Sequence, residues 1–304
     1  MDTILLLLPL ISIALIGYFA GRKKFFDENF SSQINKFLFF VALPIFLIGS
    51  FDGITLEYAL NFLPFILINT VIICAIYFAI YIIAKSLKVK NESTAAILTP
   101  SLSGNTFYFG FPILMALFGE EHVTYAIIYM NFVLLSDYLG IFMITRLMGE
   151  KFSLSKQLTD FIKTPIVLAT IIAILLMILQ MSLPEKVLEF TEFFGRTIST
   201  LALFSLGLYF AKGLNLADLK SPFIVATIKL MLFPLVTYIV VYHIIPLPKV
   251  AAQTSVILTC MPSAVYNIII ADTYKTKKEI TATSILLTSL LFIVTSIFWI
   301  NLVK

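Results

Sequence analysis

Residues 98–120, LTPSLSGNTFYFGFPILMALFGE, place helix-breaking residues inside a long apolar segment. The stretch contains two prolines, three glycines, two serines, two threonines and Asn105. Proline removes a backbone donor and glycine favours non-helical conformations, so a regular helix through these residues is unfavourable. The stretch therefore predicts an interrupted helix, and the surroundings of that helix must explain why the interruption is tolerated.

The composition indicates a membrane protein. Hydrophobic residues make up 60% of the 304 residues, charged residues make up 12%, and the mean hydropathy is +1.02. A bilayer core of about 30 Å needs about 20 apolar residues per helix, whereas a transmembrane β-barrel shows segments of about ten residues with alternating polarity. The apolar runs of this chain are long and unbroken, so we predict an all-α integral membrane protein.

Ten apolar segments fill almost the whole chain. The connections between them are short and polar, and they leave no room for a soluble domain. We therefore predict one membrane domain over residues 1–304. The predicted spans are residues 3–21, 33–51, 58–84, 93–118, 122–148, 162–181, 188–211, 221–245, 250–273 and 279–302.

The basic residues predict the orientation, because Lys and Arg in short loops are retained on the cytoplasmic side. One set of alternate loops, beginning with Arg22 and ending with Lys278, carries sixteen of the 21 basic residues. The other set, counted with both chain termini, carries four. We expect a multi-pass protein of the cell membrane with both termini outside. The net charge of +4 reflects this topology, and no nucleic-acid partner is expected.

The sequence offers no catalytic or metal-binding pattern. Cys74 and Cys260 both fall within predicted spans, and His122 and His243 form no HExxH motif. There is also no nucleotide-binding motif, which excludes a built-in ATP-driven pump. We therefore expect neither an enzyme nor a metal nor another cofactor.

The two halves of the chain echo each other. Five predicted spans precede the basic loop near Lys151 and five follow it, so the halves have opposite topology. TAAILTP at 94–100 resembles TSVILTC at 254–260, and FDGITLEYAL at 51–60 resembles AKGLNLADLK at 211–220 at the same offset of 160 residues. Inverted repeats are common in secondary transporters. We predict two inverted five-helix repeats, about 1–150 and 160–304.

This correspondence pairs the two spans that contain helix breakers, 93–118 and 250–273. The second contains TSVILTCMPSAVYNIIIADTY at 254–274, with Pro262, Ser263 and Asn267 near its middle. Non-helical backbone at membrane depth survives only where protein encloses it or where it lines a cavity. Broken helices in corresponding places of two halves indicate a transport site near the bilayer midplane.

These residues resemble the auxin efflux carrier family, which includes plant auxin exporters and many bacterial and archaeal carriers. Unlike plant members, the chain has Asn267 in place of a second proline, and it lacks their large central loop. The resemblance implies ten helices in two inverted repeats, with the fourth and ninth helices crossing as in bile acid symporters and sodium–proton antiporters. The matching positions are Asn35, Pro44, Asn105, Thr106, Gly110, Pro112, Gly119, Pro262, Ala271 and Tyr274.

All the candidate substrate-binding residues except Asn131, which belongs to span 122–148, lie in the two interrupted spans. Each also has a structural interpretation: Asn105 as a residue that packs helices together, and the prolines as simple kinks. The assignment of Asn267 rests on its position alone. The full set is Asn105, Thr106, Gly110, Pro112, Asn131, Pro262, Ser263, Tyr266 and Asn267.

Asp137 and Lys229 are the candidate coupling residues. A carboxylate near the middle of a span is costly and is usually paired, enclosed or functional, so Asp137 is a candidate proton carrier. A structural ion pair with Lys229 is the alternative, and Lys229 could equally extend to the cytoplasmic surface. Asn131 shares the interior with Asp137 only if a wide face of their helix is buried.

The favoured function is secondary transport of a small organic anion, a carboxylate or an auxin-like acid, by alternating access and in the direction of export. The driving force would be the membrane potential, a proton gradient or a sodium gradient. Two alternatives stay open: a sodium-coupled organic anion symporter, and a membrane ligand or lipid sensor that does not transport. Membrane lipids are expected partners, and the sequence leaves both a monomer and a homodimer open.

The topology is testable by cysteine accessibility in a background without Cys74 and Cys260. Because basic loops stay inside, one group of single cysteines should be protected from an impermeant reagent in intact cells, and the other group should be labelled. External labelling of the first group would overturn the ten-span arrangement. The first group lies near Lys23, Lys88, Lys156 and Lys277, and the second lies near Glu57, Glu121 and Lys249.

Overall fold

The structure is a computed structural model that describes residues 2–27, 29–149, 159, 162–211, 213 and 219–304. Within these residues every element is a helix, and β-type pairing is limited to one isolated antiparallel bridge between Gly104 and Ser263. The predicted all-α class is therefore confirmed.

The described residues form two compact units. Unit 1 combines Met1–Leu63, Phe111–Leu117 and Ser153–Gly213, and unit 2 combines Pro64–Gly110, Phe118–Phe152 and Leu214–Lys304. Each unit takes residues from both halves of the sequence. The units therefore differ from the two repeats expected from the sequence, which follow chain order and stay a prediction.

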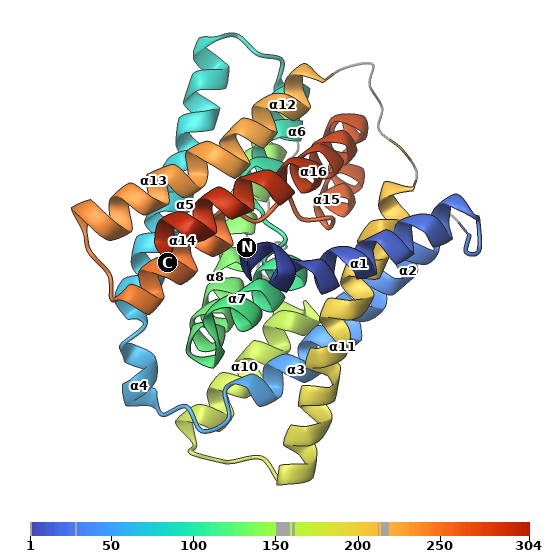
Figure 1. The fold of residues 1–304 in the computed structure, drawn as a ribbon. Coiled ribbons are helices and arrows are strands. Elements are labelled where there is room, and N and C mark those ends of the chain that lie inside the picture. Colours follow the sequence, from blue (N-terminus) through green and yellow to red (C-terminus); the bar gives the residue numbers. More distant parts are fainter. Residues whose placement is uncertain (1, 28, 150–158, 160–161, 212, 214–218) are drawn as a thin grey trace. The chain divides into compact units, whose positions relative to one another are not determined.

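Unit 1 is built around one long helix, α11. This helix packs along α1 and also contacts α2 and α3, while α10 packs against α3 (Figure 1). Its helices are α1 (Asp2–Arg22), α2 (Phe30–Phe37), the π-helix η1 (Leu38–Ala42), α3 (Leu43–Ser50), α4 (Leu56–Leu60), α7 (Phe111–Phe118, up to Leu117), α10 (Pro165–Ile178) and α11 (Glu185–Phe210).

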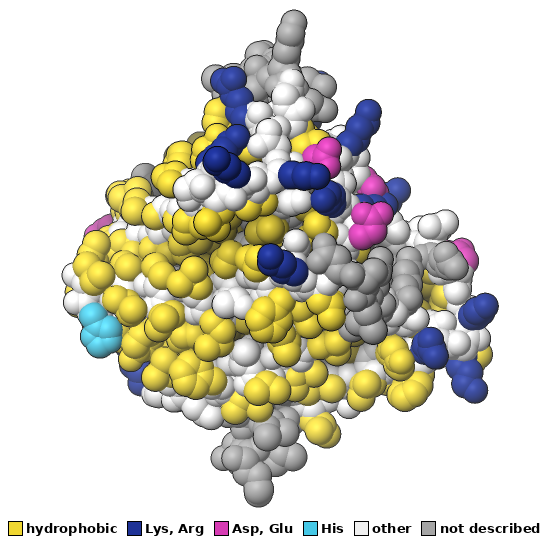
Figure 2. Space-filling view, turned by 90° about the horizontal axis from the view of Figure 1, so that it is seen from above, with side chains coloured by type: hydrophobic (Ala, Val, Ile, Leu, Met, Phe, Trp, Pro, Cys, Tyr) yellow, Lys and Arg dark blue, Asp and Glu magenta, His cyan; other side chains and the backbone are white. Residues whose placement is uncertain are grey.

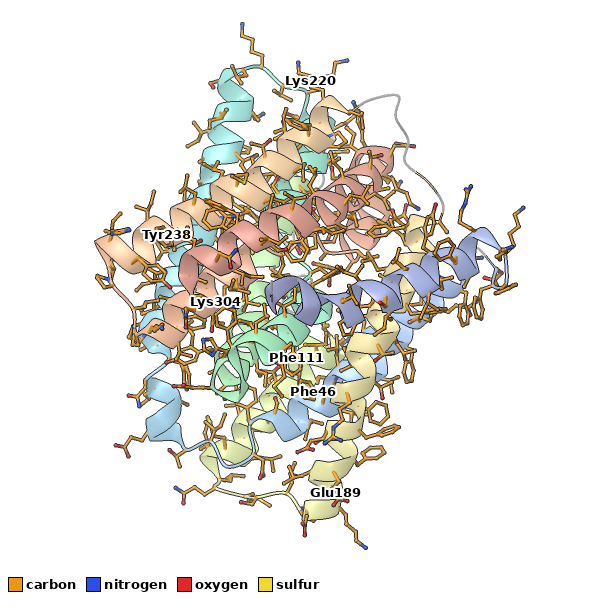
Figure 3. The ribbon with its side chains drawn as sticks, viewed as in Figure 1. Phe46, Phe111, Glu189, Lys220, Tyr238 and Lys304 are labelled. Atoms are coloured by element: carbon orange, nitrogen blue, oxygen red, sulfur yellow. The ribbon has the colours of Figure 1, made fainter. Side chains whose placement is uncertain are left out.

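Glycines allow α1 and α11 to approach closely. A Cβ atom on Gly207 would collide with the carbonyl oxygen of Ala14, and one on Gly17 would collide with that of Phe204. Small residues at such contacts let helix backbones touch, which is the usual way helices associate in lipid. Elsewhere in unit 1, the rings of Phe46 and Phe111 meet edge to face with centroids 5.5 Å apart (Figure 3).

Unit 2 surrounds two interrupted helices with continuous ones. The final helix contacts α6, α12, α14 and α15, and α8 contacts α6 and α14. The elements are α5 (Leu63–Ser86, from Pro64), α6 (Asn91–Leu102), η2 (Thr106–Gly110), α8 (Glu120–Met148), α12 (Lys220–Thr227), η3 (Ile228–Leu232), α13 (Phe233–Ile239), η4 (Val240–Ile244), α14 (Lys249–Thr259), α15 (Asn267–Thr273) and α16 (Lys278–Val303), with η2, η3 and η4 being π-helices.

Five helical segments among the described residues are long and apolar enough to cross a membrane: Phe30–Ser50, Leu63–Ser86, Glu185–Phe210, Lys220–Ile244 and Lys278–Val303. Large apolar side chains on them are exposed, as Val71, Ile82 and Val294 show. Hydrophobic side chains accordingly spread over much of the surface seen in Figure 2. Exposed apolar surface on this scale indicates contact with lipid.

The predicted segments 93–118 and 250–273 are each divided near their middle. The first contains α6, η2 and α7 with residues 103–105 outside the helices, and the second contains α14 and α15 with residues 260–266 between them. The helix breakers in the sequence thus act where they were expected to act.

The glycine contact between α1 and α11 gives a stability test. In water, Gly→Ala within a helix is favourable by about 1 kcal/mol, but here the added methyl group must push two backbones apart. Gly207→Ala and Gly17→Ala should therefore each destabilise the protein by about 1–3 kcal/mol, as overpacking does. Thermal unfolding in detergent measures the effect. The exposed neighbour Ile16 serves as the control, since Ile16→Ala should change little; a Gly207→Ala variant as stable as the parent would contradict the packing.

Candidate functional site

Two short non-helical segments of unit 2 pair with each other. The backbone N–H of Asn105 donates to the carbonyl of Pro262 at 2.7 Å, and the N–H of Ala264 donates to the carbonyl of Ser103 at 2.9 Å. These two bonds flank the bridge between Gly104 and Ser263. The pairing explains how irregular backbone survives here, since each break supplies the partner that the other lacks.

The end of α6 is satisfied by side chains from other segments. The last carbonyls of a helix have no intrahelical donor. In α6, the carbonyl of Pro100 accepts from the Ser263 hydroxyl, and that of Leu102 accepts from the Lys229 ammonium at 3.1 Å. Just beyond, the carbonyl of Ser103 also accepts from the Asn267 amide nitrogen at 3.3 Å. The two interrupted helices are therefore held together by direct hydrogen bonds.

Lys229 brings a positive charge to the ends of α6 and α14. Its side chain is only 1% exposed, and its ammonium donates to the carbonyls of both Leu102 and Thr259 at 3.1 Å. It also lies 4.7 Å from the centre of the Phe233 ring. The alternative in which Lys229 extends to the membrane surface is therefore wrong. The structure does not describe the Asp137 side chain, so the alternative of an ion pair between Asp137 and Lys229 stays a prediction.

A π-helical turn holds Lys229 in position. Lys229 belongs to η3, and Pro234 follows two residues after that turn ends. Proline cannot donate to the carbonyl four residues earlier, which here is Leu230. The indole N–H of Trp299, a side chain only 1% exposed, donates to that carbonyl at 2.8 Å. The turn that carries Lys229 is thus tied to α16, and π-turns of this kind are frequent at functional sites.

Two amide side chains at the pairing keep unused hydrogen-bonding capacity. The Nδ2 of Asn105, a residue 3% exposed, and the Oδ1 of Asn267, a residue 0% exposed, have no hydrogen-bond partner among the described residues. Asn267 Nδ2 donates to the carbonyls of Ser103 and Ala264, which fixes its amide with the oxygen pointing elsewhere. Buried polar groups are normally paired, so the unused donor and the unused acceptor make these paired segments a candidate binding site.

The other predicted site residues of unit 2 differ in burial and in contacts. Thr106 is buried beside Asn105, and Tyr266 is half-buried where α15 begins. The backbone N–H of Ser263 donates to the Thr288 hydroxyl at 3.1 Å. Gly110 lies so close to Leu258 and Met261 that packing accounts for its lack of a side chain.

For three of the predicted residues the structure describes the backbone but not the side chain. Pro112 belongs to unit 1, whereas Asn131 and Asp137 lie within α8 of unit 2. Their backbones are helical, but their side chains are not among the described ones. Their assignment as substrate or coupling residues stays a prediction.

Sequence reasoning missed the contribution of α16. Thr281, Ser284 and Thr288 are all buried and follow each other at helical spacing on one face, and Thr288 supports the backbone of Ser263. This stripe of small hydroxyl residues in an apolar helix was a readable signal, because polar side chains in membrane helices usually face other helices.

Unit 1 contains a separate cavity of about 350 Å³. It lies between residues 48–55 and 173–182, and the Asp52 carboxylate beside it accepts a hydrogen bond from the backbone N–H of Leu183 at 2.8 Å. That contact gives Asp52 a structural role in joining two loops.

Among the described residues, no group of three or more His, Cys, Asp or Glu side chains could hold a metal ion.

The sequence matches known proteins over nearly its full length. It is 24% identical over 311 residues to the uncharacterized transporter MJ1031 of Methanocaldococcus jannaschii, covering 98% of this chain and 97% of the relative. It is 25% identical over 307 residues to the uncharacterized transporter YfdV of Escherichia coli, covering 97% of this chain and 95% of the relative. The profile of the family described as "Membrane transport protein" matches residues 3–300. Together with its apolar helices, this match makes the chain a multi-pass membrane protein that belongs to the membrane transport protein family, the auxin efflux carrier family that its motifs resemble.

Proposed function

We propose that this protein carries a small organic anion across the membrane by alternating access, and that the paired breaks of unit 2 bind the anion. The observation that carries the proposal is the buried pair of unused groups, Asn105 Nδ2 and Asn267 Oδ1, beside the helix breaks. A ligand that satisfies both would remove the cost of leaving them unpaired.

The chemistry of the two groups defines the substrate further. An amide N–H donates to a carboxylate, so Asn105 Nδ2 would bind an anionic oxygen. Asn267 Oδ1 can only accept, so it would receive an N–H or O–H of the same substrate. The Lys229 ammonium adds positive charge to this part of unit 2. The proposed substrate class is therefore a small carboxylate that also carries a hydrogen-bond donor.

The proposed architecture is ten transmembrane helices in two inverted repeats with crossing fourth and ninth helices, in the cell membrane with both termini outside. The breaks in both predicted spans and the bonds between them support the crossing. The existence of two compact units supports a mechanism in which one moves relative to the other. The direction proposed is export.

A sodium-coupled symporter is the second candidate. Sodium sites need clustered oxygen ligands, and the breaks provide carbonyls, amides and hydroxyls, but two of the carbonyls already accept from Lys229. A sensor of the same fold is a third candidate, and it would bind ligand without flux in proteoliposomes. Membership of a transport family favours the carriers.

Removing the unused donor tests the binding site. Asn105→Ala should weaken apparent substrate affinity about two- to tenfold, because one uncharged hydrogen bond contributes about 0.5–1.5 kcal/mol. Its stability should stay near that of the parent, since Asn105 Nδ2 has no partner among the described residues. Asn267→Ala should also weaken affinity, but with lower stability, because its amide donates to Ser103 and Ala264. Carboxylates found by a thermal-shift screen would serve as ligands, followed by flux measurements.

Asn69 provides the matched control. Its amide donates to the Phe65 carbonyl and the Ser255 hydroxyl in the same unit, and neither partner belongs to the non-helical segments 103–105 and 260–266. Asn69→Ala should lower the melting temperature without changing the apparent affinity. If Asn105→Ala and Asn267→Ala both transport like the parent at every substrate concentration, the breaks are not the binding site.

Asp137 tests the proton-coupling proposal. Asp137→Asn keeps the shape of the side chain but cannot load and release a proton. A coupling role predicts that the variant still binds and exchanges substrate but no longer accumulates it under an imposed pH gradient. A structural ion pair predicts instead a loss of stability that Lys229→Met partly restores, since an unpaired buried charge is removed. Accumulation at the parental level would leave uniport driven by the membrane potential as the better mechanism.

A further inference from the structure

The geometry points to Lys229 as a built-in cation: its ammonium occupies the position between two helix ends where a sodium-coupled carrier of this design would hold its ion. Transport by this protein would then be independent of sodium. The inference on transport rests on the proposed carrier function, whereas the inference on ion binding depends only on the helix ends.

The carboxyl ends of α6 and α14 create a region of partial negative charge. α6 ends at Leu102 and α14 ends at Thr259, and the carboxyl end of a helix carries partial negative charge. In carriers with broken helices, such ends and the unwound carbonyls are the groups that coordinate sodium or protons. Both carbonyls here accept from the same ammonium, and both distances are 3.1 Å, within the range of an N–H···O bond.

The space at this place is shaped around the ammonium. A Cβ atom on Gly104 would lie 2.8 Å from Lys229 Nζ and 3.1 Å from its Cε. The absence of a side chain at residue 104 therefore allows the lysine to reach both carbonyls. Phe233 adds an aromatic ring 4.7 Å from the ammonium, a favourable contact for a cation.

The lysine is also fixed from its own helix. The π-turn η3 carries it, and the indole of Trp299 binds the Leu230 carbonyl that Pro234 leaves without a donor. Unlike a bound sodium ion, the ammonium is covalently attached and cannot leave with the substrate. The ammonium therefore stays beside the two helix ends through the transport cycle, and no sodium gradient is used at this position.

The first experiment needs no substrate and no variant. Thermal unfolding of the purified full-length protein is followed in rising sodium chloride, with choline chloride at equal ionic strength as the reference. A ligand that binds only the folded state raises the melting temperature as its concentration rises. The expected result is no difference between sodium and choline. A sodium-specific rise would overturn the inference, whatever the fate of the proposed substrate site.

Replacing the lysine gives the second experiment. Lys229→Ser removes the ammonium and leaves room beside the Leu102 and Thr259 carbonyls, so its melting temperature should fall and then recover in part with sodium but not with choline. Lys229→Met removes the charge but fills the space, so its melting temperature should fall without recovery in sodium. A Lys229→Ser variant that responds equally to both salts, or a Lys229→Met variant as stable as the parent, would contradict the assignment.

Flux measurements complete the test and separate it from the transport proposal. Proteoliposomes containing the parent and a carboxylate identified by thermal shift should transport at the same rate when choline replaces sodium on both sides. Sodium-dependent flux would overturn the built-in cation while leaving carrier function intact. If Lys229→Ser cannot be purified, the sodium titration and this flux comparison of the parent decide the question.

Discussion

The backbone pairing between the two helix breaks is the constraint on which unit 2 depends. The backbone N–H groups of Asn105 and Ala264 are satisfied by this pairing, in which they donate to the carbonyls of Pro262 and Ser103. Each unsatisfied backbone group in hydrocarbon costs several kcal/mol. Each break therefore supplies hydrogen-bond partners to the backbone of the other.

The same requirement explains the buried polar residues around the breaks. Helix ends created in an apolar environment leave carbonyls that side chains must satisfy, and Ser263, Lys229 and Asn267 supply those donors from distant parts of the sequence. In unit 1, α1 and α11 meet closely through Gly17 and Gly207. In the same unit the Ser205 hydroxyl of α11 donates to the Ser31 carbonyl and to Asn35 Oδ1 at α2, so polar contacts join helices there as well.

Much of the fold was readable from the sequence because the bilayer imposes a simple rule. Apolar segments long enough to span must be helices, and helix breakers within them must mark places where protein encloses the backbone. The breaks near Asn105 and Pro262 were found in this way. The packing of Gly110 was not, because its close neighbours come from another part of the chain. The polar stripe that contains Thr288 was readable as a buried face, but its partner, the Ser263 backbone, was not.

The all-α class and the two places where helices break follow from local composition and backbone chemistry, so the sequence was enough to predict them. The position of Lys229 depends instead on tertiary contacts. Along the chain it is a single charge inside an apolar helix, equally able to extend to the surface or to pair inside. Lys229 lies between the ends of α6 and α14 because segments from three parts of the chain meet there. The carbonyls of Leu102 and Thr259 at these helix ends stabilise the ammonium, whereas lipid would not.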